Sequence, residues 1–232
     1  MRGKRRIQLA AQMTGDMDTA SRHMKPLAID LFCGVGGWTD GLLAEGWEPI
    51  GFDIERHIYG EHRYPAQLVL QDVLTLHGSQ FRDAALIVAS PPCQAYSYRA
   101  MPWSRAKALP PPDNSLFEAC FRIQREACEA AARHIPLVVE NVRGAQKWVG
   151  RARFNVGSFY FWGDVPALMP DMRVKKQPSD GSWFYDNYEN SSRRFSSRSK
   201  ERKEWSAMIA KIPLPLSRHI ARTFKPSPFP HP

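Results

Sequence analysis

The sequence lacks a long apolar run. None of its apolar segments approaches the ~20 residues that a membrane-spanning helix needs, and the segment after the basic N-terminal residues is too short for a signal peptide. We therefore expect no membrane association and a cytoplasmic location. The sequence also lacks a CxxC pair among its four cysteines and a metal-ligand spacing among its seven histidines. This predicts free thiols in a reducing compartment and no metal site.

Negative charge is scarce in the sequence. Its 23 acidic residues stand against 32 lysines and arginines, which gives a net charge of +9. Such an excess suits a polyanionic partner, of which nucleic acid is the common one. A merely basic protein fits the charge equally well, so charge only supports arguments from motifs.

From residue 27 onward, predicted strands and helices alternate. Strands are predicted at 27–32, 49–53, 67–70, 85–89 and 136–140, and helices at 38–44, 116–133 and 207–224. Before the long helix, Ser115-Leu-Phe-Glu118 has the form of a capping box. The apolar face of this helix is predicted to hold Leu116, Cys120, Ile123, Ala127 and Ala131. The alternation indicates an α/β fold whose mostly parallel sheet has helices on both faces, with ligands beyond the carboxyl ends of the strands.

The first predicted strand runs into a glycine turn, Asp-Leu-Phe-Cys-Gly-Val-Gly-Gly at 30–37. Glycines let the backbone approach a ligand closely, although such a turn alone is a weak sign of a nucleotide-like ligand. Asp53 and Asp72 end later strands, where a carboxylate can accept hydrogen bonds from ribose hydroxyls. Helix N-caps or solvated turn acids are the alternative interpretation of both residues.

Two short motifs carry chemistry. Ser-Pro-Pro-Cys-Gln at 90–94 holds Cys93 between a rigid Pro-Pro step and a polar amide, a setting for attack rather than packing. Glu-Asn-Val at 140–142 ends another predicted strand. A structural role for Cys93 is the alternative, because buried cysteines are common. The other cysteines, Cys33, Cys120 and Cys128, are interpreted as small buried residues.

The glycine turn, the Cys93 motif and the Glu140 motif occur in this order in the DNA cytosine-5 methyltransferases, which the chain resembles over about residues 27–165 and weakly over 207–224. The resemblance implies a Rossmann-like methyltransferase fold that binds S-adenosylmethionine. It implies no metal, because the sulfonium already makes methyl transfer downhill. The cofactor residues that it implies are Phe32, Gly34, Gly36, Gly37, Asp53, Ile54, Asp72 and Pro91.

The implied chemistry begins with a thiolate that adds to C6 of a cytosine and makes C5 nucleophilic. It needs a cysteine with a lowered pKa and an acid at N3, the roles that the resemblance gives to Cys93 and Glu140. Pro92 would fix the approach of Cys93, and Asn141 would orient the Glu140 loop. A base inside a duplex is out of reach, so the target must flip out into the pocket.

Other segments are expected to contact nucleic acid. Gly150-Arg-Ala-Arg153 is the nearest match to the family's Gln-x-Arg-x-Arg motif, which assigns Arg151 and Arg153 to base and phosphate contacts. Residues 95–113 resemble the mobile loop that closes over the extruded base; an ordered Pro-rich connector is the alternative. Further contacts are expected from Gln94, Arg99, Arg105, Lys107, Arg193 and Arg194.

The implied organisation has four parts: a disordered leader at 1–24, a catalytic domain at 25–165, a small basic recognition region at 166–206, and a C-terminal helix with a frayed tail at 207–232. The chain departs from the family in two ways. The asparagine of the family's last motif is absent, and the target-recognition region is reduced. A flexible insertion remains an alternative for the basic region.

We therefore expect a DNA cytosine-5 methyltransferase that acts on double-stranded DNA, as a monomer or weak dimer. A cognate restriction endonuclease is a further partner that the resemblance allows. Two alternatives stay open: the same chemistry on RNA such as tRNA, and a degraded nucleic-acid binder without activity.

Overall fold

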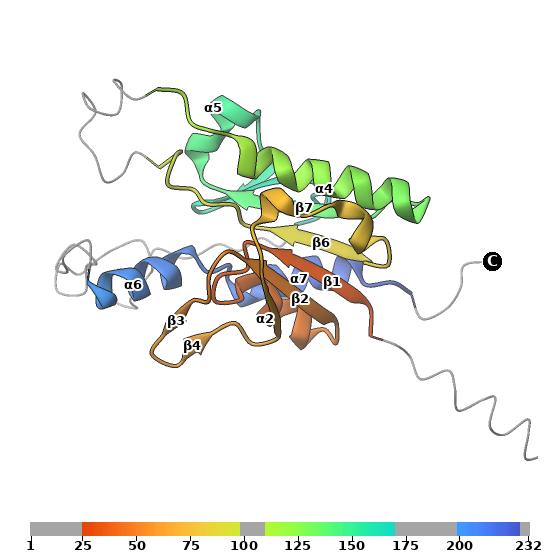
Figure 1. Cartoon of the computed structure of the whole chain (residues 1–232), viewed down its shortest axis with the longest axis horizontal. Helices are drawn as coiled ribbons and strands as arrows, with labels where there is room; N and C mark the ends of the chain where they lie inside the picture. The colour runs from red at the N-terminus through yellow and green to blue at the C-terminus, as the bar shows by residue number, and fades with distance from the viewer. Residues whose placement is uncertain (1–24, 98–109, 170–198, 228–232) are drawn as a thin grey trace, which may run out of the picture.

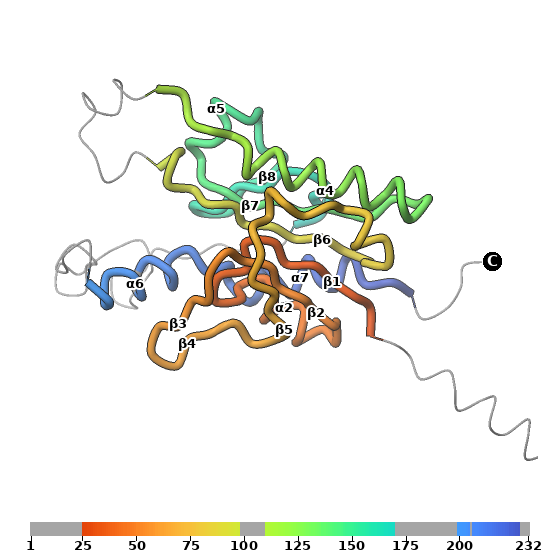
Figure 2. Tube along the Cα trace, in the orientation of Figure 1, coloured from red at the N-terminus to blue at the C-terminus, as the bar shows by residue number. Residues whose placement is uncertain are grey.

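The computed structural model describes residues 25–97, 110–169 and 199–227. Its centre is a seven-stranded sheet in the order β5-β2-β1-β6-β7-β9-β8 (Figures 1 and 2). The strands are β1 (Leu27–Leu31), β2 (Glu48–Asp53), β5 (Gln67–Leu70), β6 (Leu86–Ala89), β7 (Leu137–Asn141), β8 (Phe154–Val156) and β9 (Phe159–Gly163). The first five are parallel, and β9 is antiparallel to both of its neighbours. The predicted α/β fold with a mostly parallel sheet is confirmed.

Helices cover both faces of this sheet (Figure 1). The helices are α2 (Gly37–Ala44), α4 (Ser115–Ala131), α5 (Gln146–Val149), α6 (Lys200–Ala210) and α7 (Leu214–Phe224). On one face, Ile123 of α4 packs in a cluster with Ile29 and Leu137 of the sheet. On the other face, Trp38 of α2 and Leu216 of α7 pack on other side chains of the same strands. Strands buried on both faces explain why they read as continuous apolar runs.

Helix α4 begins differently from the prediction. Its N-cap is Asn114, whose side chain makes no capping hydrogen bond, so Ser115 is the first helical residue and not the cap of a capping box. The carboxylate of Asp113 instead accepts a hydrogen bond from the Ser115 N–H at 2.8 Å. The helix buries Phe117, Ala119, Cys120, Ile123 and Ala127. Phe117 and Ala119, on the buried side, were not on the predicted face.

The C-terminal helical pattern at 207–224 is divided between two helices, α6 and α7, because Pro213 and Pro215 interrupt it. Pro215 lies in the first turn of α7, where its missing N–H costs nothing. Helix α7 packs so closely on α2 that a Cβ on Gly41 would lie 2.4 Å from the backbone of Ser217. This contact returns the end of the chain to the helix that follows the glycine turn.

Two carboxylate contacts and one indole contact fasten α7. Glu45, just after α2, accepts hydrogen bonds from Arg218 at 2.7 Å and from Arg222 at 2.9 Å. The indole of Trp47 donates to the carbonyl of Ala221 at 3.1 Å. The partners are far apart in sequence, so α7 ties the two ends of the described chain together.

A hairpin of β3 (Ile58–Tyr59) and β4 (His62–Arg63), which the sequence did not predict, lies between β2 and β5 in the sequence and projects from the sheet (Figure 1). Short 3-10 turns, η1 (Val73–Thr75) and η2 (Gly78–Phe81), link β5 to β6, and η3 (Arg143–Ala145) follows β7. None of the helices in the described part of the chain is long and apolar enough to cross a membrane. Within the same residues, no group of His, Cys, Asp or Glu is arranged to hold a metal ion.

Several predicted segments lie outside the described residues. They are the expected leader at 1–24, most of the mobile loop with Arg99, Arg105 and Lys107, and most of the basic recognition region with Arg193 and Arg194.

Candidate active site

The predicted chemistry-bearing segments meet at one edge of the sheet. Parallel pairing aligns Leu31 with both Phe52 and Ala89, and Ala89 with Val139. The glycine turn, Asp53, the Cys93 loop and Glu140 therefore all lie at the carboxyl ends of adjacent strands. This edge is where ligands of open α/β sheets bind.

The glycines of the turn have different roles. Gly34 and Gly36 both have positive φ, at 51° and 83°. A Cβ on Gly34 would meet nothing within 4 Å, whereas one on Gly36 would lie 2.5 Å from Pro65 Cδ and one on Gly37 would lie 2.5 Å from the Ile212 backbone. Only Gly34 thus faces open space where a ligand can approach. Gly36 and Gly37 are required for internal packing.

Asp53 ties this turn to the end of β2. Its Oδ2 accepts a hydrogen bond from the Gly34 N–H at 2.9 Å, and its Oδ1 accepts one from the Ile54 N–H at 2.8 Å. The imidazole of His57 lies 3.4 Å from Oδ1. Burial alone would raise the pKa of Asp53, but the bonds from His57 and Gly34 outweigh it, so the pKa lies below its usual value. Asp53 is thus an ionised acceptor at the expected ribose position.

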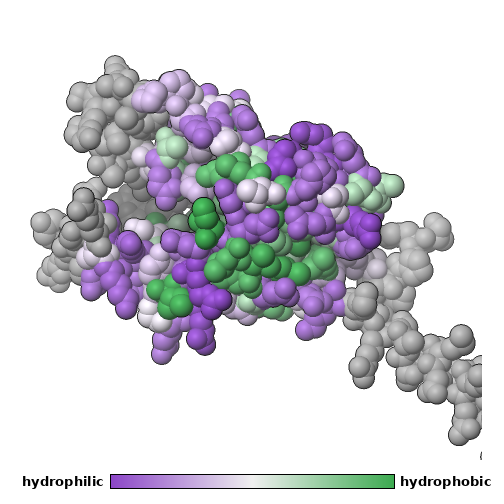
Figure 3. Space-filling model, viewed as in Figure 1, coloured by the Kyte–Doolittle hydropathy of each residue, from purple (hydrophilic) through white to green (hydrophobic). Residues whose placement is uncertain are grey.

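The residues beside Asp53 suit a flat apolar ring. Ile54 is 72% exposed, and Leu70, which pairs with Asp53 at the end of β5, is 53% exposed. Figure 3 shows an apolar area near the centre of the face in view. Asp72 caps η1 by accepting from the Leu74 N–H at 2.9 Å, which matches the alternative interpretation of this acid. The Asp72 side chain is half-buried.

Cys93 follows β6 in a tight turn. The backbone N–H groups of Tyr96 and Ser97 both donate to its carbonyl oxygen at 3.0 Å. Pro91 is buried, Pro92 is exposed, and the Cys93 side chain is half-buried. Burial, and then the charge of Glu140, raise the pKa of the Cys93 thiol. The expectation of a lowered pKa is therefore wrong for the described part of the chain, in which no positive group offsets the burial.

Glu140 lies at the end of β7, and its side chain is only 9% exposed. Burial raises the pKa of this carboxyl to about 8, against a hydrogen bond from the Ser90 hydroxyl. At neutral pH a large share of Glu140 therefore carries a proton, as a hydrogen-bond donor to a base would. The charge of Glu140 also contributes to the raised pKa of the Cys93 thiol, which lies on the turn after the neighbouring strand β6.

Asn141 joins the two loops. Its Nδ2 donates to the carbonyl oxygen of Pro91 at 3.0 Å, and its Oδ1 accepts from the Val142 N–H at 2.8 Å. It is 1% exposed. The segment with Cys93 and the segment with Glu140 are thus held together by a buried amide.

A buried polar cluster below the glycine turn escaped the sequence analysis. Asp30 is fully buried, and its Oδ2 accepts from the Thr39 hydroxyl at 2.7 Å. The Thr39 hydroxyl also bonds to that of Tyr64 at 2.7 Å. Burial raises the pKa of Asp30 to about 7, against the bond from Thr39. An acid inside an apolar strand was the only signal in the sequence.

Arg151 and Arg153 lie before β8, which β9 separates from the strand of Glu140. They line a hollow of about 520 Å³ together with Arg143, which the sequence analysis missed, and with Tyr160. In the described part of the chain, none of the three guanidinium groups pairs with a carboxylate. Gly144 packs against the carbonyl of Tyr96, so Arg143 adjoins the Cys93 loop. The structure places these arginines beside the site and shows no contact between them and Glu140.

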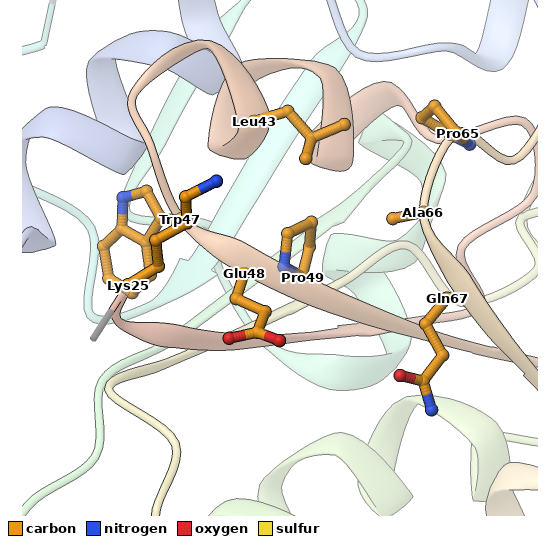
Figure 4. Close-up of a pocket in the computed structure, with 8 residues that line it drawn as sticks. All are labelled: Lys25, Leu43, Trp47, Glu48, Pro49, Pro65, Ala66 and Gln67. Carbon is orange, nitrogen blue, oxygen red and sulfur yellow. The ribbon is translucent and has the colours of Figure 1, made fainter. Parts of the chain in front are cut away.

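A second hollow, of about 340 Å³, lies at the opposite edge of the sheet (Figure 4). It is lined by Glu48 and Pro49 at the start of β2, Gln67 at the start of β5, and Leu43 of α2. These are the amino ends of the strands, so this hollow is separate from the candidate site.

Gln94, which was expected to contact nucleic acid, is exposed next to Cys93.

Comparisons with known proteins identify the family. Residues 27–156, more than half of the 232-residue chain, match the C-5 cytosine-specific DNA methylase family. A search of curated proteins found no significant match.

Solved structures are similar over part of their length. One is described as a DNA modification methyltransferase encoded within an Escherichia coli prophage, at 26% identity with a TM-score of 0.39; the match covers 54% of this chain and 35% of that one. The Schizosaccharomyces pombe Dnmt2 methyltransferase is 18% identical with a TM-score of 0.37, over 54% and 37% of the two chains. The Entamoeba histolytica methyltransferase EhMeth is 17% identical with a TM-score of 0.38, over 54% and 41%. The chain thus spans well under half the length of these proteins. On the family match, this chain belongs to the C-5 cytosine-specific DNA methylases.

Proposed function

We propose that this protein transfers a methyl group from S-adenosylmethionine to C5 of a cytosine in double-stranded DNA, with Cys93 as nucleophile and Glu140 as acid. The observation that carries the proposal is the pairing of these two residues. Cys93 lies in the turn after β6 and Glu140 lies near the end of the neighbouring strand β7, the charge of Glu140 contributes to the raised pKa of the Cys93 thiol, and the Asn141–Pro91 hydrogen bond joins the two segments. Few structural roles need a half-buried thiol and a protonated carboxyl at the same edge of a sheet.

The first step that this pair supports is addition of the Cys93 sulfur to C6 of cytosine. The Cys93 thiol first releases its proton to water; a bond then forms between the sulfur and C6, the electron pair of the C5–C6 double bond moves through the ring toward N3, and Glu140 donates a proton at N3. An ionised Glu140 opposes thiolate formation, whereas a protonated Glu140 does not. The protonated form of Glu140 therefore serves both residues at once.

The cofactor fits the glycine-turn side of the rim. Gly34, which faces open space, the ionised Asp53 and the exposed Ile54 offer close backbone approach, a ribose acceptor and an apolar platform. Phe32, Pro91 and Asp72 complete the set that would hold S-adenosylmethionine. When bound, this cofactor supplies the electrophilic methyl group for C5. Loss of the C5 proton to water, return of the N3 proton to Glu140 and expulsion of the Cys93 thiolate would then restore the aromatic ring.

Nucleic acid would bind over the Cys93 edge. Arg143, Arg151 and Arg153 line a basic hollow next to the Cys93 loop, and Gln94 is exposed there. Phosphates would neutralise these unpaired guanidinium groups, since arginine matches phosphate geometry. A flipped base would enter between Cys93 and Glu140. The proposed partners of the protein, as a monomer or weak dimer in the cytoplasm, include a cognate restriction endonuclease.

Radiolabel transfer tests the proposal. Tritiated S-adenosylmethionine is incubated with the protein and duplex DNA, tRNA or neither, and label in duplex DNA is expected. Label only in tRNA would replace DNA by RNA as substrate, and no label in either would leave a nucleic-acid binder without activity. Duplex DNA with 5-fluorocytosine should trap the protein covalently, because fluorine cannot leave as a proton does. Cys93→Ser should abolish trapping, while Cys128→Ser, a matched change at another half-buried thiol, should not.

A further inference from the structure

A hydrogen-bonded chain of side chains leads from α2 to the Glu140 carboxyl. Ala89 of β6 pairs with Val139 of β7 in a parallel register. Ser90 and Glu140 are the next residues of these segments, so their side chains lie next to each other on one face of the sheet. This is the face on which Val88 and Val138 pack against Trp38. The Ser90 hydroxyl interacts with the Glu140 carboxyl there.

The direction of these hydrogen bonds follows from the indole of Trp38, the first donor. The indole Nε1 of Trp38 donates a hydrogen bond to the Ser90 oxygen at 3.0 Å. An indole can only donate, so it occupies a lone pair of Ser90 and leaves the hydroxyl hydrogen for another acceptor. Among the described residues, the Glu140 carboxyl is the acceptor that this hydroxyl meets. Ser90 therefore donates to Glu140.

Trp38 and Ser90 are themselves held in place. Trp38 is 2% exposed and its ring meets that of Phe161 edge-on, with centroids 6.1 Å apart. Phe161 of β9 is paired with Glu140 itself. The Ser90 N–H donates to the carbonyl of Leu31 at 3.2 Å. The Ser90 hydroxyl is held by the indole of Trp38 and by its own backbone bond to Leu31. It therefore points in a defined direction, which a hydroxyl in water does not.

We propose that Ser90, oriented by Trp38, is a positioning residue that fixes the Glu140 carboxyl for its contact with the target base. The proposal rests on the proposed function for the identity of that base; the contact with Glu140 rests on the register of β6 and β7, the Trp38–Ser90 hydrogen bond and the interaction of the Ser90 hydroxyl with the carboxyl. One carboxyl oxygen is committed to Ser90, which leaves the other to carry the proton toward the ring. The hydroxyl also stabilises the ionised form of Glu140, so that burial raises its pKa less than it otherwise would.

The effect of removing the hydroxyl has a definite sign. In Ser90→Ala the ionised form of Glu140 loses a donor, so the pKa of Glu140 moves further up. A charge-assisted hydrogen bond of ordinary strength corresponds to about a tenfold change in the ionisation constant. Trp38→Phe keeps an aromatic ring but loses the indole N–H donor, and we expect it to raise the pKa of Glu140 by a smaller amount. Ser90→Thr retains the hydroxyl and should restore the wild-type value.

Titration of Glu140 by ¹³C NMR of glutamate carboxyls in the full-length protein tests the proposal without need of activity. The signal that disappears in Glu140→Gln identifies the residue. The other titratable group that faces Glu140 is the Cys93 thiol, so every variant is also titrated in a Cys93→Ala background. Ser79→Ala, at an exposed serine of η2, serves as the matched control and should change nothing. An unchanged Glu140 titration in Ser90→Ala would overturn the proposal.

A second readout covers the chemistry. Single-turnover methyl transfer should fall about tenfold in Ser90→Ala and recover in Ser90→Thr, with cofactor and DNA affinities unchanged. Equal losses in Ser90→Ala and Ser90→Thr would overturn the positioning role. Absence of transfer in the wild type would refute the proposed function, and the NMR titration would still decide the contact. If Ser90→Ala does not fold, as shown by its thermal melt, Trp38→Phe carries the same test.

Discussion

The side-chain amide of Asn141 donates a hydrogen bond to the backbone carbonyl of Pro91 at 3.0 Å, and so connects the segment with Glu140 to the segment with Cys93. Both ends of this contact are buried. The same amide also accepts from the Val142 N–H. The Asn141 side chain thus holds together the two segments that carry Cys93 and Glu140, which are proposed to act on the same base.

Asn141→Ala should leave the Pro91 carbonyl and the Val142 N–H without their partner. A buried unsatisfied group costs about 1–3 kcal/mol, so we expect the free energy of unfolding to fall by about that amount. Urea denaturation measures it. Asn155→Ala, at an exposed position of β8, is the matched control and should change stability by less than about 0.5 kcal/mol. Equal stability of wild type and Asn141→Ala would show that the amide is not needed.

Stability should depend on pH through Glu140. Burial raises the pKa of its carboxyl from 4.5 in the unfolded chain to about 8 in the fold. The fold therefore holds a proton that the unfolded chain releases, so this contribution to stability is complete below pH 4.5 and is lost as pH rises to about 8. Glu140→Gln removes the group that titrates. The difference in unfolding free energy between variant and wild type should grow across this window, and a flat difference would contradict the raised pKa.

Asp30 should also make the protein less stable as pH rises, for the same reason as Glu140. Burial raises its pKa from 3.8 to about 7, so its contribution is lost over a lower window that ends near pH 7. Asp30→Asn keeps an acceptor for Thr39 and should remove the share of the slope that Asp30 contributes between pH 3.8 and about 7, while the share of Glu140 remains. The two variants are compared by urea denaturation at a series of pH values.

Substitutions of Gly34 and Gly36 should affect different properties, cofactor binding for Gly34 and the stability of the fold for Gly36. Gly36→Ala would place a Cβ 2.5 Å from Pro65 Cδ at a φ of 83°, and we expect it to lower the free energy of unfolding by about 2 kcal/mol or more. Gly34→Ala meets no neighbour and carries only the strain of positive φ, about 1 kcal/mol. Its methyl group would instead enter the space proposed for the cofactor.

Calorimetry of S-adenosylmethionine binding distinguishes the two glycines. Gly34→Ala should weaken binding more than it weakens the fold, whereas Gly36→Ala should do the reverse. If Gly34→Ala binds the cofactor as the wild type does, the open side of the turn is not the cofactor site.

The sequence was informative wherever a motif follows a strand. Apolar runs predicted five parallel strands, and the rule about carboxyl ends brought Asp53, Cys93 and Glu140 to one edge. The contacts across that edge could not be predicted, because they join residues that neither periodicity nor spacing relates. Trp38 and Ser90 lie on different elements, and Asp30 meets Tyr64 only through Thr39. The raised pKa of Cys93 depends on burial, which a motif does not show.

Strand β9 shows the same limit. Its sequence, Phe-Tyr-Phe-Trp-Gly, has strand propensity, yet only the sheet reveals that it inserts antiparallel between β7 and β8. This insertion places one strand between Glu140 and the strand that Arg151 and Arg153 precede. Arg143, which immediately follows the Glu-Asn-Val motif, joins them at the same hollow.

The basic hollow should contribute salt-sensitive affinity for nucleic acid. Each guanidinium group that contacts a phosphate releases counterions, so its loss flattens the dependence of affinity on salt by about one unit of slope. Arg143→Ala, Arg151→Ala and Arg153→Ala should each weaken duplex binding, as fluorescence anisotropy at several salt concentrations would measure. Arg125→Ala, at an exposed arginine on α4, is the matched control. Because phosphate contacts carry no sequence information, the loss should be equal for DNA of any sequence. A loss confined to one sequence would indicate that these arginines contact base edges, and an unchanged salt slope would place the nucleic acid elsewhere on the protein.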